Sequence, residues 1–204
     1  MKTFQYTAFS QRGRGKSHNE DAVLIDNQVH QGSVREDGMV DIAQPRYFAI
    51  ADGVAIGTLP RVASRRLLEI LSKHLTLATA AEPLSPLLHQ VQQDYVALSD
   101  NPRFHGMAAT LVGMRLYDNT ATTFNVGDSR AYLLVDGRAH LLSRDHSLLN
   151  DLIDDGEITP ELGENTASIL QGLTCQFIAD GECDYFRVNI TTQNLFHTVF
   201  LPIC

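Results

Sequence analysis

The spacing of apolar residues along the chain predicts two helices near its middle. Over residues 60–75, Val62, Leu67, Leu71 and neighbouring leucines recur at helical spacing, with basic residues between them. Residues 84–98 repeat the same pattern. We therefore expect two consecutive amphipathic helices that each bury one face, and we expect the arginines of the first to form a solvated face rather than a docking patch.

Short segments rich in β-branched and aromatic residues predict strands on both sides of these helices. Before the helices, the strand candidates are residues 4–10, 22–25 and 47–51, with a polar hairpin excursion over residues 27–44. After the helices, the candidates are residues 110–116, 120–126, 130–135, 138–142, 173–178, 184–190 and 197–204. A short helix is expected over residues 147–155, with Asp145 or Ser147 as its N-cap and Gly156 just past its end.

This order of elements favours an α+β fold. Strands come first, two helices follow, and a run of antiparallel-looking strands closes the chain, which argues against alternating βαβ units. The chain has 204 residues, of which 44% are hydrophobic, so it can bury one substantial core. No repeat or linker is visible, and we expect a single domain over residues 1–204.

Charge and cysteine content narrow the possible partners and compartment. The formal net charge of -8 argues against a general nucleic-acid or anionic-membrane surface, although the loop over residues 11–18 is locally basic. Cys175, Cys183 and Cys204 are odd in number and show no C-x-x-C spacing, so neither a disulfide framework nor a thiolate zinc site is indicated. Without an apolar signal core or a long apolar run, we expect a soluble, cytoplasmic and monomeric protein.

Three aspartates stand where predicted strands give way to turns. Asp21, Asp52 and Asp128 each lie at such a boundary, and glycine adjoins two of them. A carboxylate at the end of an apolar strand is costly to desolvate unless a positive group pairs with it, and hard cations such as Mg2+ and Mn2+ prefer oxygen ligands. The pattern predicts a carboxylate metal site. A strand-end aspartate can also simply form a turn, and for Asp128 both interpretations stay open.

Five motifs in order resemble the type 2C, metal-dependent serine/threonine protein phosphatases in their compact bacterial form. Residues 16–22 resemble the family's basic-x-x-N-E-D-A motif, and residues 48–53 resemble its F-x-x-A-D-G strand end. Residues 125–132 match the N-x-G-D-S-R-x-Y pattern, and residues 142–147 are similar to the L-x-x-D-H-S segment. The remaining motif, residues 106–112, is the third in the chain and is similar to a segment of small residues and threonine, with Ala108 and Ala109 in place of the usual glycine and threonine.

The resemblance implies a four-layer α-β-β-α sandwich of two antiparallel sheets flanked by helices, with two Mg2+ or Mn2+ ions at one edge. Asp52 would bridge both ions, and Gly53 would offer its carbonyl to one. Asp21, with Glu20, would hold the other ion mainly through water. Asp128 resembles the residue that helps to hold a third, weakly bound metal in bacterial members.

The same resemblance implies hydrolysis of phosphoserine and phosphothreonine in proteins by a metal-activated water, with Asp52 and Lys16 as the catalytic residues. Lys16 takes the place of the family's usual phosphate-binding arginine, and Arg14 or Arg12 is expected to help. Lysine acts as a point charge without the bidentate fork of arginine, so we expect a weaker clamp. The expected partner is a phosphorylated protein substrate of a serine/threonine kinase in bacterial signalling, with no nucleic acid or membrane involved.

The chain also departs from the family's pattern. It stops before the D-G and D-N motifs that supply two further ligands, so the sandwich is expected to be incomplete at its C-terminus. Residues 54–57 replace the usual glycine-rich turn. The alternative hypothesis is therefore a catalytically impaired or inactive relative that acts as a phosphoprotein- or partner-binding module. A third, weaker hypothesis is a phosphatase of the sporulation-regulator type. Lone histidines such as His146 are expected to be structural.

Overall fold

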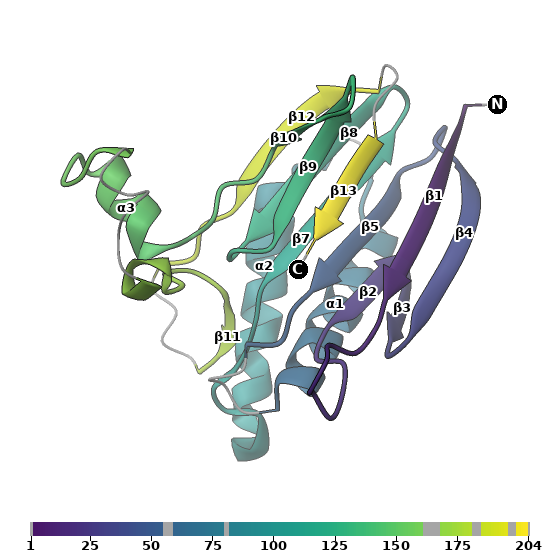
Figure 1. Cartoon of the computed structure of the whole chain (residues 1–204). Helices are drawn as coiled ribbons and strands as arrows, with labels where there is room; N and C mark the ends of the chain where they lie inside the picture. Colours follow the sequence, from purple (N-terminus) through teal and green to yellow (C-terminus); the bar gives the residue numbers. More distant parts are fainter. Residues whose placement is uncertain are drawn as a thin grey trace.

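A six-stranded antiparallel sheet is the centre of the fold (Figure 1). The computed structural model describes residues 2–54, 59–79, 82–160, 168–180, 185–195 and 199–203. The strands of this sheet lie in the order β12-β8-β7-β5-β2-β3. Their bounds are β2 Ala22–Ile25, β3 Gln28–Gln31, β5 Arg46–Ala51, β7 Leu111–Tyr117, β8 Thr120–Val126 and β12 Asn189–Asn194.

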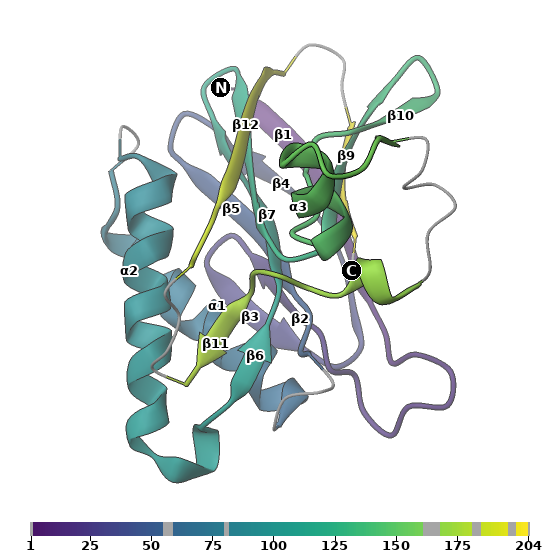
Figure 2. The ribbon, with the colours of Figure 1, turned by 90° about the vertical axis from the view of Figure 1, so that its left-hand side faces the viewer.

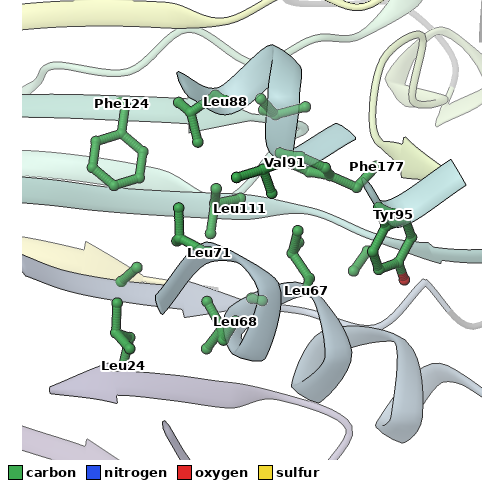
Figure 3. Close-up of a cluster of buried hydrophobic side chains, with 14 of the residues drawn as sticks. Leu24, Leu67, Leu68, Leu71, Leu88, Val91, Tyr95, Leu111, Phe124 and Phe177 are labelled. Carbon is green, nitrogen blue, oxygen red and sulfur yellow. The ribbon is translucent and has the colours of Figure 1, made fainter. Parts of the chain in front are cut away.

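Two helices cover one face of this sheet. They are α1, Pro60–Leu77, and α2, Leu84–Val96, which continues into the 3-10 helix η1, Ala97–Asp100. Figure 3 shows leucines of both helices gathered between the helix ribbons and the strands, with Leu111 and Phe124 on the sheet side. The buried positions follow the helical spacing of the sequence, so burial of one apolar face holds each helix on the sheet.

Two smaller sheets lie over the other face, as a second β layer (Figure 1). One pairs β1, Thr3–Ser10, with β4, Val34–Asp41, and the other has the order β10-β9-β13. The bounds of these last strands are β9 Arg130–Val135, β10 Arg138–Leu141 and β13 Val199–Ile203. Tyr6 of β1 packs on Phe48 of β5 with ring centroids 5.1 Å apart, so this layer is joined to the six-stranded sheet by side-chain packing.

Short elements complete the described part of the chain. Strands β6, Met107–Ala109, and β11, Phe177–Ala179, pair beside α2 (Figure 2). Helix α3, Leu148–Asp154, stands to one side of the sheets (Figure 1), and η2, Pro102–Phe104, and η3, Ser168–Gln171, are single 3-10 turns. No helix of the described residues combines the length and the apolar character needed to cross a membrane.

The predicted α+β class with packed antiparallel sheets and flanking helices is confirmed. Both long helices and the strands around residues 22–25, 47–51, 120–126 and 130–135 form close to their predicted bounds. Ser147 is the N-cap of α3, since its hydroxyl accepts a hydrogen bond from the Asn150 amide, and Gly156 follows the helix with φ +75°.

Three strand predictions need correction. Residues 27–44 do not form one hairpin, because β3 pairs with β2 while β4 pairs with β1. The strand expected over residues 173–178 is reduced to β11, since Leu173 bridges to Ser147 instead. The strand expected over residues 184–190 begins only at Asn189, opposite Asn125 of β8; residue 184 itself lies outside the described residues.

Candidate metal centre

The register of two neighbouring strands brings Asp21 and Asp52 together. Ala22 of β2 pairs with Ala51 of β5, so the residue before β2 and the residue after β5 stand opposite each other at one edge of the sheet. Their carboxyl groups lie within hydrogen-bonding reach of each other, with Asp52 as the partner that would carry the shared proton. Burial is the main reason why the pKa of each group is raised. For Asp52, the negative charges of Asp21, Asp128 and Glu20 raise the pKa further, to about 7.

The loop between β1 and β2 positions Glu20 and Lys16 next to this pair. Asn19 is buried, and its side-chain amide donates to the Ser10 hydroxyl at 2.8 Å and to the Gly32 carbonyl at 2.9 Å, which fixes the end of the loop. Lys16 Nζ forms an ion pair with Glu20 Oε2 at 2.7 Å. This hydrogen bond is the main reason why the pKa of Lys16 is raised, and Asp52 and Asp21 contribute through their charge.

Gly53 lies where the start of α1 approaches the end of β5. A Cβ atom on Gly53 would lie 2.0 Å from the Pro60 carbonyl oxygen, so only glycine fits without a backbone shift. Gly53 also bridges to Ala109, and the Thr110 amide donates to the Asp52 carbonyl at 2.9 Å. The backbone around Asp52 is therefore held from two sides. The sequence departure at residues 54–57 falls largely outside the described residues, which resume at Leu59.

Asp128 occupies the turn between β8 and β9 and is exposed. The turn depends on Gly127, whose φ of +104° favours glycine and whose Cβ would lie 2.5 Å from Thr110 Cγ2. Partial burial raises the pKa of Asp128, and the charge of Asp145 raises it further. Asp128 lies within electrostatic reach of Asp52, but it is not part of the hydrogen-bonded pair.

Residues 143–147, which we call the clasp, hold this turn in place. The Gly127 amide donates to His146 Nδ1 at 3.0 Å, and the His146 amide donates to the Gly127 carbonyl at 2.9 Å. Arg130 binds both carboxylate oxygens of Asp145 from the other side of the turn. Burial lowers the pKa of His146 to about 4, with the nearby Arg187 cation adding to the effect, so the ring is neutral at physiological pH. The histidine predicted to be structural therefore supports the Asp128 turn.

The expected site residues are brought together only in part. Asp21 and Asp52 are in contact, Glu20 and Asp128 are near enough to affect the pKa of Asp52, and Gly53 is its neighbour in the chain. Arg14 is exposed and contacts none of these carboxylates in the described structure, whereas Arg12 Nη1 donates to the Lys16 carbonyl at 2.7 Å. The support from Thr110 and from the clasp was not foreseen in the sequence.

The donor set fits a hard divalent cation. All the candidate ligands are oxygen atoms, and several carboxylates are gathered at a partly buried strand end where a cation would offset their mutual repulsion. Within the described ranges, no three acidic, histidine or cysteine side chains already form a complete ligand arrangement. The Asp21–Asp52 pair is therefore the part of such a centre that these residues provide.

Sequence comparison finds known relatives of this chain. The family profile for protein phosphatase 2C matches residues 7–151. The serine/threonine protein phosphatase PstP of Mycobacterium tuberculosis is 29% identical over 161 residues, which are 77% of this chain and 28% of that protein. The serine/threonine phosphatase Stp of Listeria monocytogenes is 31% identical over 159 residues, which are 74% of this chain and 58% of that protein. The chain thus spans less than two thirds of either relative.

Structure comparison gives the same fold. The crystal structure of the PstP catalytic domain in complex with two manganese ions superposes with a TM-score of 0.60 at 22% identity. The superposition covers 98% of this chain and 76% of that one. At this identity the likeness establishes the arrangement of elements and says nothing by itself about activity.

Proposed function

This chain belongs to the protein phosphatase 2C family, and we propose that it hydrolyses phosphoserine and phosphothreonine in proteins with the help of divalent cations. The observation that carries the proposal is the contact between the carboxyl groups of Asp21 and Asp52, which come from separate strands to one edge of the sheet. The phosphatase relatives support the reaction, and the manganese ions of PstP support the need for metal.

Each candidate ligand has a distinct part in this proposal. Asp52 would bind both ions, the Gly53 carbonyl would be a ligand of one, and Asp21, with Glu20, would hold the other mainly through water. Asp128 is the candidate for a third, weaker ion. When bound, such ions lower the pKa of a coordinated water and offset charge on phosphoryl oxygens. Mg2+ and Mn2+ are both compatible with this set of oxygen donors.

The residues of the loop between β1 and β2 would then orient the phosphate. Lys16 is held beside the carboxylates by Glu20, and a phosphate group that enters would compete with Glu20 for the ammonium group. Because Asn19 fixes the end of the loop, Lys16 would meet the substrate from a defined side. The phosphorylated substrate would be the product of a serine/threonine kinase.

Metal-dependent phosphate release tests this function. We expect the chain to hydrolyse p-nitrophenyl phosphate with 1 to 10 mM Mn2+, roughly the range suited to weak sites, and to lose that activity in EDTA. Restoring Mn2+ after EDTA should recover it. Release that is unaffected by EDTA, or absent at every Mn2+ concentration, would contradict the proposal.

A second candidate function is a binding module without turnover. It is favoured by the observation that only two of the candidate ligands are in contact within the described residues. Titration calorimetry separates the two functions, since a binding module would take up a phosphopeptide while showing no heat of Mn2+ binding. Mn2+ uptake together with phosphate release would exclude the module.

A further inference from the structure

The start of α1, which includes Arg61, packs against the backbone of the candidate metal centre. The Arg61 carbonyl accepts from Gln31 Nε2 at 2.7 Å, and the Ser64 hydroxyl, which also lies near that carbonyl, donates to the carbonyl of Glu20. Pro60 touches the position of Gly53, as its carbonyl oxygen lies 2.0 Å from where a Cβ there would be. The first turn of α1, which includes Arg61, therefore contacts the backbone segments that carry Glu20 and Asp52.

Arg61 and Arg14 differ from the other arginines of this region. Arg65 and Arg66 both form ion pairs with Glu69, at 2.8 and 2.9 Å, as a solvated helix face would. The side chains of Arg61 and Arg14 are exposed, and no ion pair engages either of them in the described ranges. Figures 1 and 2 show the loop after β1 and the start of α1 at the same end of the six-stranded sheet.

The position of Arg61 is unfavourable for the helix itself. Helix α1 has no acidic residue in its first turn and no side-chain cap, so its own first turn supplies no counterion to a cation there. The helix dipole makes that end partly positive, and a guanidinium group there is repelled. The helix itself therefore gives no reason for an arginine at this position.

We propose that Arg61 and Arg14 form a basic rim that favours phosphopeptides with acidic residues next to the phosphorylated serine or threonine. This rests on the proposed function, in which Asp21, Asp52 and Glu20 are engaged by cations. With those carboxylates neutralised, the positive charges of Arg61 and Arg14 would face the residues that flank the phosphate. A protein with a net charge of -8 otherwise repels acidic peptides, and a local cluster of cations restores attraction over about one Debye length, roughly 8 Å at physiological salt.

Two phosphothreonine peptides of equal length, one with acidic and one with neutral flanking residues, test this inference. Each is made with a phosphonate in place of the phosphate, so that affinity is measured by fluorescence anisotropy without turnover. We expect the acidic peptide to bind about three- to tenfold more tightly at low salt, with the difference shrinking as salt increases.

Charge reversal at Arg61 provides the sharper test. Arg61→Glu should lower the affinity for the acidic peptide by about fivefold and for the neutral peptide by less than about twofold. A residue with only a structural role would change the affinities for both peptides by the same factor.

Lys73→Glu is the matched control, since it makes the same charge change on the same helix about 18 Å away by helical rise. It should leave the ratio of the two affinities unchanged. Equal affinities of the wild type for the two peptides, including no binding of either, would overturn the inference, as would equal effects of Arg61→Glu and Lys73→Glu. Failure to hydrolyse p-nitrophenyl phosphate would instead count against the proposed function, because the phosphonate peptides need no turnover.

Discussion

Replacing Asp52 with asparagine is expected to reduce Mn2+-dependent phosphate release by more than about 100-fold. Residues that only support a metal ligand cost up to about 100-fold when they are mutated, and a direct ligand should cost more. Asparagine keeps the shape of the side chain but loses the negative charge that Asp52 would offer to both ions. The measurement is p-nitrophenyl phosphate hydrolysis over a range of Mn2+ concentrations. An activity within a fewfold of wild type would remove Asp52 from the catalytic site.

The same substitution should stabilise the metal-free chain. The pKa of Asp52 is raised from its ordinary value near 3.8 to about 7, so the folded chain loses stability as pH rises between these values and carries the full cost above pH 7. The asparagine side chain does not titrate, and in EDTA at pH 8 the Asp52→Asn variant should gain unfolding free energy on the order of 2 kcal/mol, since solvent screens part of the repulsion at this partly exposed site. The gain should vanish near pH 4.

Two comparisons isolate this effect. Because the pKa of His146 is lowered, the folded chain loses stability as pH falls from 6.5 towards 4, which is the opposite pH dependence. His146 is present in both proteins, so this contribution cancels when their unfolding free energies are subtracted. Asp136→Asn is the control for the chemical change, because Asp136 lies in the turn after β9 with φ 49°, which asparagine tolerates. It should change neither activity nor the pH dependence of stability.

Gly53→Ala is expected to lower the free energy of unfolding by about 2 to 4 kcal/mol and to disrupt the metal centre as well. The added methyl group would lie 2.0 Å from the Pro60 carbonyl oxygen, so α1 must move away from the end of β5. Urea denaturation measures the loss of stability, and Mn2+ titration measures the loss of the site.

Gly13→Ala is the matched control for this glycine. A Cβ on Gly13 would have Lys16 Cγ as its nearest neighbour, at 3.7 Å, which is an ordinary contact. We expect its stability to stay within about 0.5 kcal/mol of wild type. If Gly53→Ala were equally mild, α1 would not pack against the end of β5 as closely as the structure has it.

The sequence predicted those elements whose pattern is local. The leucines of α1 and α2 repeat with the helical period, and β2, β5 and β8 are short apolar runs bounded by turns, so their identity depends on few distant contacts. The segment around Leu173 and Arg187 was misjudged because its conformation is decided at long range. Leu173 bridges to Ser147, and Arg187 forms a bidentate ion pair with Asp151 of α3. No periodicity in the sequence carries that information.

The candidate site likewise has a part that local sequence patterns predict and a part that only the folded chain reveals. Asp21 and Asp52 could be singled out because each ends an apolar strand, and the pairing of Ala22 with Ala51 then determines that they meet. The supporting contacts could not be found in this way. The exchange of hydrogen bonds between Gly127 and His146 joins residues 19 positions apart, and only the folded chain brings them together.

The division of the second β layer into two sheets has a consequence for local opening. The β1–β4 ribbon shares no backbone ladder with any other described strand, so its amide protons are protected by one partner strand and by side chains such as Tyr6 on Phe48. Two-stranded ribbons are marginal without such packing. We therefore expect amide hydrogen exchange in β1 and β4 to proceed through sub-global fluctuations that detach this ribbon, and exchange in β5 and β7 to require unfolding of the whole chain.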